Sequence, residues 1–157
     1  MEIQEEAMSG DPFNFISFDE GVQRIRGAWG QSGKAYNPDR VMTSRDEDVL
    51  RTIDSLKISG MENGFEKWHL PVYFAKEESQ GAQFFITKAE PNAKVREHSH
   101  KDGDAMRFIV SGSVIYNGKE LVGGDWMFVP KDVPYALDVG PNGAIMCYCY
   151  PCCCVPR

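Results

Sequence analysis

Cysteine and histidine are scarce in this chain of 157 residues, and the distribution of the cysteines excludes one class of protein. All five cysteines fall in the last eleven residues, as Cys147, Cys149, Cys152, Cys153 and Cys154. A secreted disulfide scaffold instead spreads its cysteines so that they close loops along the chain. We therefore expect no disulfide framework.

Basic residues are fewer than acidic ones, and long apolar runs are absent from the sequence. The chain has 17 Lys and Arg against 23 Asp and Glu, a net charge of -6, so it offers no surface suited to nucleic acid or to an anionic membrane. No segment approaches the roughly 18 apolar residues of a spanning helix. The first residues, 1–11, are acidic and lack the basic and apolar regions of a secretory signal, so we expect a cytoplasmic protein.

Hydrophobic residues, at 42%, are numerous enough for one well-packed domain, 1–157. The 15 glycines and 9 prolines are spread along the chain, as many short strands joined by turns require. We expect a mobile segment 1–11, an arm and helix in 12–66, a β-sandwich in 67–150 and a cysteine-rich tail in 151–157.

One helix is predicted before the strands, and residues 12–37 are expected to form an irregular arm. Ser44-Arg45-Asp46-Glu47 has the sequence of a capping box, in which the serine hydroxyl and the glutamate each accept a hydrogen bond from a free backbone N–H. Apolar residues then recur at helical spacing, and Gly60 ends the run. These apolar residues are Val49, Leu50, Ile53 and Leu56.

Nine short strands are predicted after the helix. The dipeptide Asn117-Gly118 lies between two of them and predicts a tight hairpin turn, because both central positions need a positive φ. Many short strands with a single helix favour a sandwich or barrel. The predicted strands are 70–75, 82–90, 94–99, 105–111, 113–116, 119–121, 125–129, 134–139 and 143–150.

His98 and His100 are the first residues that point to chemistry. On a strand, residues two apart point to the same face, about 6 to 7 Å apart along the chain. Two imidazoles placed in this way can bind one metal ion.

The surroundings of this pair resemble the first motif of the cupin family, which runs Gly, five residues, His-x-His, three or four residues, Glu, six residues, Gly. His98, His100 and Gly112 match this motif. Asn92 stands at the first glycine, a mild change because Asn tolerates a left-handed conformation. Ala105 stands where the family has its metal-binding glutamate.

A second cupin motif runs Gly, five residues, Pro-x-Gly, two residues, His, three residues, Asn. Gly124 and Pro130 match it, whereas Asp132, Tyr135 and Val139 replace the glycine, the histidine and the asparagine. The two motifs together cover residues 92–139. This resemblance implies an all-β cupin fold, an antiparallel jelly-roll β-sandwich or barrel, with a metal ion held between the sheets.

Two residues are candidates for completing that site. Tyr135 occupies the position of the family's third histidine and is interpreted as a metal ligand, a proton donor or a hydrogen-bonded aromatic of the barrel. Asp104 can bind the ion if it faces inward, and then Met106, Phe108 and Val110 face inward as well.

The opposite register turns Ala105, Arg107 and Ile109 inward. Arg107 is then suited to gripping a substrate carboxylate by two parallel hydrogen bonds. We favour the Asp104 register. His69, the third histidine, is expected at the surface or against the helix.

The cysteine tail leaves its role open. Cys147 and Cys149 alternate with tyrosines, so they share one face of the last strand, and either thiol could face the barrel. The remaining three follow Pro151 and could wrap a soft ion such as zinc or copper(I), or remain reduced thiols on a packed tail.

We expect a metal-dependent cupin enzyme that acts on a small organic molecule, with a dioxygenase-like activity at a mononuclear non-haem iron. Fe(II) is the favoured ion, with zinc, nickel or manganese as alternatives. Tyr135 and Arg107 are the expected catalytic residues, and Trp126 is an alternative pocket residue. A non-catalytic or sensing cupin that binds a small ligand or a metal, and a metal-free epimerase or cyclase, are the other hypotheses. The resemblance also implies a homodimer, paired through a sheet edge.

Overall fold

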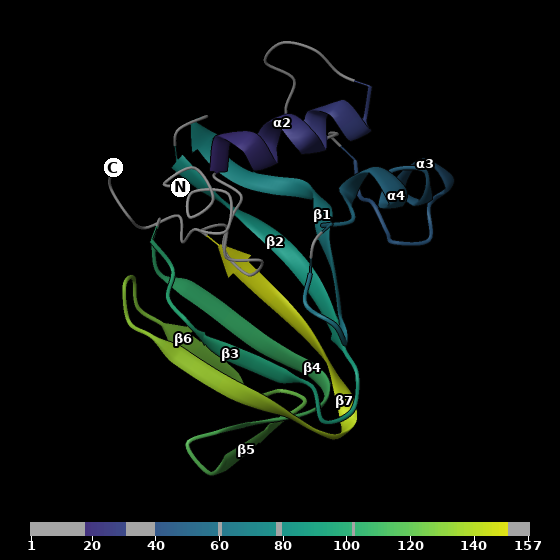
Figure 1. Ribbon diagram of the computed structural model, residues 1–157. Helices are drawn as coiled ribbons and strands as arrows, with labels where there is room; N and C mark the ends of the chain where they lie inside the picture. Colours follow the sequence, from purple (N-terminus) through teal and green to yellow (C-terminus); the bar gives the residue numbers. More distant parts are fainter. Residues whose placement is uncertain (1–17, 31–39, 60, 78–79, 102, 151–157) are drawn as a thin grey trace, which may run out of the picture.

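The computed structural model describes residues 18–30, 40–59, 61–77, 80–101 and 103–150 (Figure 1). Residues 1–11, which were expected to be mobile, lie outside the described residues. The same is true of the tail 151–157, for which a metal role was considered, and of Gly60, which was expected to end the helix. Within the described ranges, the helices are all too short or too polar to cross a membrane.

Antiparallel strands make up most of the described chain. Nine strands were predicted, and the described residues contain seven, because the predicted pairs 105–111 with 113–116 and 134–139 with 143–150 are each continuous. The strands are β1 Phe65–Glu77, β2 Gln80–Ala89, β3 Lys94–His98, β4 Ala105–Tyr116, β5 Lys119–Val122, β6 Trp126–Val129 and β7 Tyr135–Tyr150.

The two long strands, β4 and β7, pair with each other and pass through both layers of a sandwich. Residues 105–112 and 144–150 lie in one layer, in the order β1-β2-β7-β4-β6. Residues 113–116 and 135–139 lie in the other layer, in the order β3-β7-β4-β5. The predicted antiparallel sandwich is confirmed, and Figure 1 shows β1 and β2 on its right-hand side.

Two glycines allow the long strands to bend between the layers. Gly112 and Gly143 have φ values of 71° and 77°, a left-handed conformation that side chains disfavour. A Cβ on Gly112 would lie only 2.0 Å from the carbonyl oxygen of Gly143, so no other residue fits there. Because of the bend, β7 contributes inward-facing side chains to the core from both layers.

Turn residues behave as the sequence indicates. Asn117 and Gly118 have φ values of 49° and 73°, which confirms the predicted hairpin turn between β4 and β5. Asn92 and Asp132, which stand at two glycine positions of the motifs described above, also have positive φ values of 62° and 63°. Both positions therefore adopt the left-handed conformation that glycine adopts most easily.

The predicted helix is wrong in its extent. The segment forms two short helices, α3 Glu47–Leu50 and α4 Ile53–Leu56, and Leu50 and Ile53 are exposed. No capping box forms, because Asp46 is the N-cap and its carboxylate accepts hydrogen bonds from the backbone N–H and the hydroxyl of Thr43, at 3.0 and 2.8 Å. The Asp46 carboxylate forms this local turn, and the helix therefore begins at Glu47 with Asp46 as its N-cap, instead of beginning after Ser44 as the sequence pattern predicts.

The irregular arm expected in 12–37 contains a helix instead, α2 Phe18–Ala28, which is longer than α3 and α4. This helix packs against β1 and β2, and its own Val22 and Ile25 are buried. Gly21 lies directly against the side chain of Gln83, where a Cβ would come within 1.8 Å of the amide oxygen. The helix therefore covers one end of the sandwich.

We expect Gly112→Ala to lower the free energy of unfolding by about 3 kcal/mol, because it adds strain at a positive φ and a collision with backbone. Gly118→Ala is the matched control, since its φ is similar but its Cβ would meet open space, and it should cost only about 1 kcal/mol. Urea denaturation measures both. Equal losses would contradict the assigned role of Gly112.

Candidate functional site

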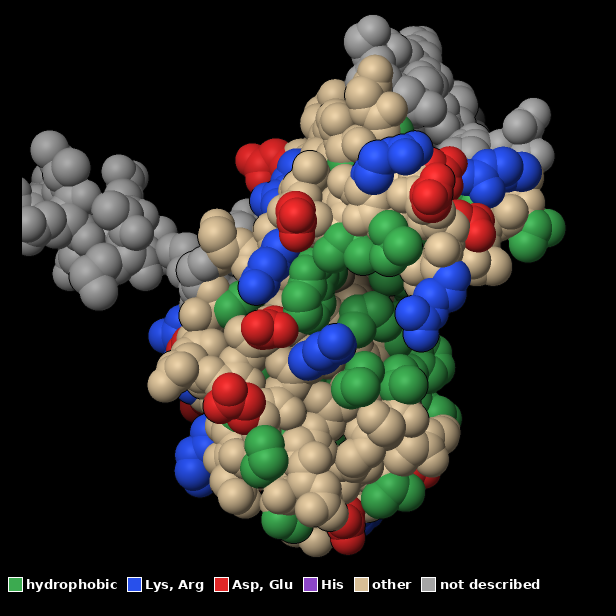
Figure 2. All heavy atoms as spheres, turned by 90° about the vertical axis from the view of Figure 1, so that its right-hand side faces the viewer, with side chains coloured by type: hydrophobic (Ala, Val, Ile, Leu, Met, Phe, Trp, Pro, Cys, Tyr) green, Lys and Arg blue, Asp and Glu red, His purple; other side chains and the backbone are tan. Residues whose placement is uncertain are grey.

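The inner face of the five-stranded layer carries buried polar side chains among its apolar ones, whereas the buried face of an antiparallel sheet is usually apolar. Cross-strand pairs place Arg107 opposite Tyr148 and His69 opposite Phe85, and the next row contains Thr87 and Lys67. Each of these side chains except Phe85 carries a polar or charged group, and all of them are buried. Hydrophobic side chains also gather on the outside of the molecule, on the side where β1 lies (Figure 2).

His98 and His100 both lie inside the sandwich, with His100 fully buried. Their ring centroids are 5.1 Å apart and the rings are perpendicular. β3 ends at His98, so His100 follows the strand instead of lying on it as expected. The Nδ1 of His98 lies 2.9 Å from the carbonyl oxygen of Arg96, so Nδ1 carries the proton and the lone pair is on Nε2.

Two tyrosines converge on His100 from opposite layers. The hydroxyl of Tyr148 lies 2.6 Å from His100 Nε2, and that of Tyr135 lies 3.1 Å from the same atom. Burial, followed by the charges of His98, Arg107 and Lys67, lowers the pKa of His100 from 6.5 to about 2. His100 is therefore neutral near physiological pH and orients the tyrosine hydroxyls.

Arg107 is the buried charge of this cluster. It donates from Nη2 to the Tyr135 hydroxyl at 2.9 Å and from Nη1 toward the sulfur of Met146 at 3.5 Å, and its guanidinium carbon lies 4.8 Å from the Tyr148 ring centre. Its Nε is buried without a hydrogen-bond partner. Neither of its hydrogen-bond partners is a carboxylate, and across the described ranges it takes part in no ion pair.

The favoured register of β4 was wrong. Ala105, Arg107 and Ile109 face inward, and Phe108 is exposed on the other face. Asp104 does not join the histidines, because its Oδ1 accepts a hydrogen bond from the backbone N–H of Lys131 at 2.8 Å. The alternative register, with a guanidinium inside the sandwich, is the one observed.

His69 was expected at the surface or against the helix, and it is buried, with its hydrogen-bond partner Gln83 lying against α2. Its Nε2 lies 2.9 Å from the amide oxygen of Gln83, and its ring stacks on Phe85 with centroids 4.3 Å apart. Burial lowers the pKa of His69 to about 4, the charges of Arg24 and Lys67 act in the same direction, and the hydrogen bond to Gln83 opposes them. The cover provided by α2 could not be foreseen from the strand pattern.

Three further candidates point away from the site. Trp126, considered as a pocket residue, is exposed on the outer face. Cys147 and Cys149 lie on that same outer face, since Tyr148 between them points inward, and burial raises the pKa of the Cys147 thiol. The three cysteines that follow Pro151 lie outside the described residues.

The described residues do not fit the metal ion that the family resemblance implies. Two imidazoles are available, but the described part of the chain brings together no group of three His, Cys, Asp or Glu side chains. The hydroxyl of Tyr135, at the position of the third histidine, is bound by the cationic Arg107. A permanent positive charge at that distance repels a divalent cation, and no described carboxylate offsets it.

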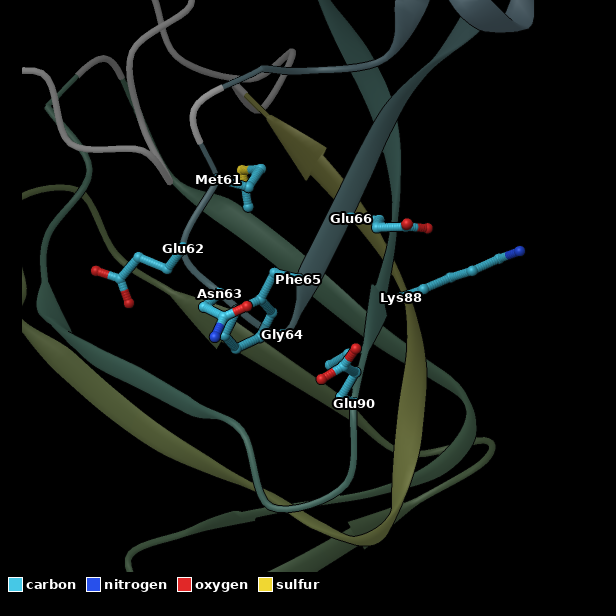
Figure 3. Close-up of a pocket in the computed structure, with 9 residues that line it drawn as sticks. Met61, Glu62, Asn63, Gly64, Phe65, Glu66, Lys88 and Glu90 are labelled. Carbon is cyan, nitrogen blue, oxygen red and sulfur yellow. The ribbon is translucent and has the colours of Figure 1, made fainter.

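A small cavity lies against the cationic residues. Its volume is about 10 Å³, which is room for about one water molecule. A larger hollow of about 450 Å³ lies outside the sandwich, where Glu62, Glu66 and Lys88 point in different directions (Figure 3). The inner cavity is lined by Phe65, Lys67, Thr87, Val95, Arg107, Met146 and Tyr148.

Lys67 and Tyr148 are site residues that the sequence analysis missed. The alternation of the last strand gave a signal for Tyr148, because residues that alternate with the two cysteines must share the opposite face. Lys67 lay just before the first predicted strand, which in fact begins at Phe65.

No protein-family model and no curated protein sequence matches the chain. Among solved structures it is similar to KdgF from Halomonas sp., with 18% identity and a TM-score of 0.46 over 58% of this chain and 82% of that one. An RmlC-like cupin from Shewanella frigidimarina has 23% identity and a TM-score of 0.48 over 61% and 83%. The cupin domain of an XRE family transcriptional regulator from Enterobacter cloacae has 16% identity and a TM-score of 0.44 over 57% and 99%. Similarity at this level carries nothing about activity.

We expect acid to destabilise the protein between about pH 6.5 and pH 4. Unfolded histidines bind protons below about 6.5, whereas His69 stays neutral in the fold down to a pKa of about 4, so the unfolded state binds more protons in this window. The free energy of unfolding should fall by roughly 1.4 kcal/mol per pH unit for each such histidine.

Urea denaturation at several pH values measures this slope, and His69→Gln should flatten it while keeping an amide donor for Gln83. A slope unchanged in that variant would contradict the burial of a neutral His69.

Proposed function

We propose that this chain, which has a cupin-type fold, binds a small organic anion between its two layers, with Arg107 holding the carboxylate of the ligand. The observation that carries this proposal is the buried guanidinium, which no carboxylate of the described chain accompanies. Of the three classes of function expected from the sequence, this is the binding or sensing cupin.

The energetics of a buried charge support an anionic ligand. A charge removed from water costs several kcal/mol unless a counter-charge and hydrogen bonds compensate it. Arg107 has one phenol oxygen and one weakly accepting sulfur as partners, and its buried Nε remains available. A carboxylate can accept two parallel hydrogen bonds from a guanidinium, the geometry that compensates such a charge best.

Lys67 adds a second positive charge to the same cavity. Its Nζ lies 4.6 Å from the ring centre of Phe85 and 5.2 Å from that of Tyr148, so aromatic faces hold the ammonium in place. Two cations on one small cavity favour an anion over a neutral ligand.

The size of the cavity favours a compact ligand. Its volume of about 10 Å³ is less than a carboxylate group needs, so side chains must move when a ligand enters. Met146 and Lys67 line the cavity, and both are unbranched and flexible enough to make room. We therefore propose a small organic acid.

The catalytic hypotheses have less support. A general base near physiological pH needs a pKa close to that pH, and the pKa of His100 lies far below it. His100 therefore suits the orientation of tyrosine hydroxyls better than proton abstraction in an epimerase or cyclase. The dioxygenase-like activity needs a metal ion, for which the described side chains are a poor donor set.

We expect the wild type to bind formate or acetate and to discriminate against acetamide, the neutral analogue of acetate. Arg107→Gln should weaken acetate binding by roughly 30-fold or more, because it removes the charge and the paired donors. Two-dimensional NMR titration measures both affinities. Arg45→Gln, at an exposed arginine, is the matched control and should bind like the wild type.

A stability measurement separates a binding role for Arg107 from a structural one. Arg107→Met replaces the buried charge by an apolar chain of similar length, so the ligand-free protein should be as stable as the wild type or more stable by about 1 to 3 kcal/mol. A loss of stability in Arg107→Met, or equal binding of acetate and acetamide, would overturn the proposal.

We also expect the purified protein to contain far less than one metal ion per chain, because the cluster holds the positive charge of Arg107 where a metal site needs a carboxylate side chain. Elemental analysis of protein prepared without added metal measures this content, and chelator should leave the melting temperature unchanged. Stoichiometric metal that is lost in His98→Ala would instead support the metal-dependent enzyme.

A further inference from the structure

Lys67 is a buried amine that the proposed binding role uses only as a charge. Its side chain belongs to an inward-facing row of the sheet, in which Lys67 on β1 pairs with Thr87 on β2 and Thr87 pairs with Met146 on β7. Only 8% of Lys67 is exposed, which is rare for a lysine. Because a lysine inside a protein can act as a nucleophile, its surroundings decide what chemistry it can perform.

The walls around the Lys67 nitrogen are aromatic and apolar. The Nζ atom lies 4.6 Å from the ring centre of Phe85 and 5.2 Å from that of Tyr148, so the two rings fix its position. Phe65 and Val95 line the same cavity, and both are buried. Removal of a lysine from water favours its neutral amine, the form that attacks a carbonyl carbon.

Arg107 provides a second condition for a nucleophilic lysine, a neighbouring positive charge. Its guanidinium carbon lies 4.8 Å from the centre of the same Tyr148 ring, and Arg107 and Lys67 line the same cavity. A positive charge disfavours another one nearby, so it also favours the neutral amine of a lysine. One cavity therefore combines two features that activate lysines, burial and a cationic neighbour.

We propose that Lys67 forms a reversible Schiff base with the carbonyl carbon of a small 2-oxo acid, an inference that rests on the proposed binding of the carboxylate by Arg107. A 2-oxo acid has its carbonyl group directly beside its carboxylate, so one compact molecule next to the Tyr148 ring can meet both side chains. The small volume of the cavity, about 10 Å³, favours such an acid over longer oxo acids, in which the two groups are further apart.

The step needs no reactant besides the acid and water. The ammonium gives one proton to water, the neutral nitrogen attacks the carbonyl carbon to form a C–N bond, and the π electron pair of the carbonyl moves to its oxygen. That oxygen takes one proton from the nitrogen and one back from water. It leaves as water when the nitrogen lone pair forms the C=N bond. The product is an iminium with the same positive charge as the ammonium, so the bound carboxylate keeps its counter-charge.

Reductive trapping with pyruvate tests the proposal on the full chain. Cyanoborohydride reduces an iminium to a stable amine, so wild type incubated with both reagents should gain the mass of one reduced pyruvate, which peptide mapping should place on Lys67. Lys67→Arg keeps the charge but cannot form an imine, and it should lose this labelling. Lys88→Arg is the matched control, because the Lys88 ammonium also lies near an aromatic ring, 5.4 Å from the centre of Trp68, but the residue is exposed. This control should be labelled on Lys67 like the wild type.

A second measurement uses the wild type alone, so it does not depend on the folding of a variant. Acetate should protect Lys67 from labelling by pyruvate. Pyruvamide, the neutral analogue of pyruvate, should label Lys67 roughly 30-fold more slowly or less, because it lacks the charged partner of Arg107. Labelling by pyruvate that is spread over exposed lysines without preference for Lys67, or equal labelling by pyruvamide, would overturn the proposal.

The result is distinguishable from that of the proposed function, because labelling is read as mass and acetate binding by NMR. Acetate binding by a chain in which pyruvate labels no lysine would overturn the Schiff base and leave the anion site standing. A chain that binds no acetate would overturn both.

Discussion

The hydrogen bond between Arg107 and Tyr135 is the interaction on which the site depends. It joins a side chain of the five-stranded layer to one of the opposite layer, and both tyrosines then meet at His100. Tyr135 and Tyr148 belong to the same strand, β7, on either side of its bend. The tight approach of Gly112 to Gly143 is what lets one strand supply the site from both sides.

Much of the fold could be predicted because its signals are local. Turn dipeptides, short strands and tolerated positive φ positions depend on a few neighbouring residues, and Asn117-Gly118 gave a correct hairpin. The prediction of one helix in 44–59 failed because the turn made by Thr43 and Asp46, which the capping-box pattern does not contain, makes Asp46 the N-cap of a short helix. The packing of α2 on Gln83 depends on contacts far apart in the chain, which no local pattern contains.

The candidate site was predicted in part for a similar reason. His98, His100, Tyr135 and Arg107 were named, and all four lie in one buried cluster. The face of β4 that points into the sandwich was predicted wrongly. Both faces of this strand contain large apolar residues, so alternation alone favoured neither. An interior that holds a guanidinium and an exterior that holds Phe108 invert the assumption that apolar residues face inward.

The position of β7 also governs the order in which the protein can fold. This strand lies between β2 and β4 in the sheet, although both precede it in the chain. Until it is synthesised, β2 and β4 have open inner edges, and β4 alone among the described strands runs through both layers. Folding on the ribosome is therefore expected to wait for β7, which brings both tyrosines to His100 in the same step that completes the sandwich.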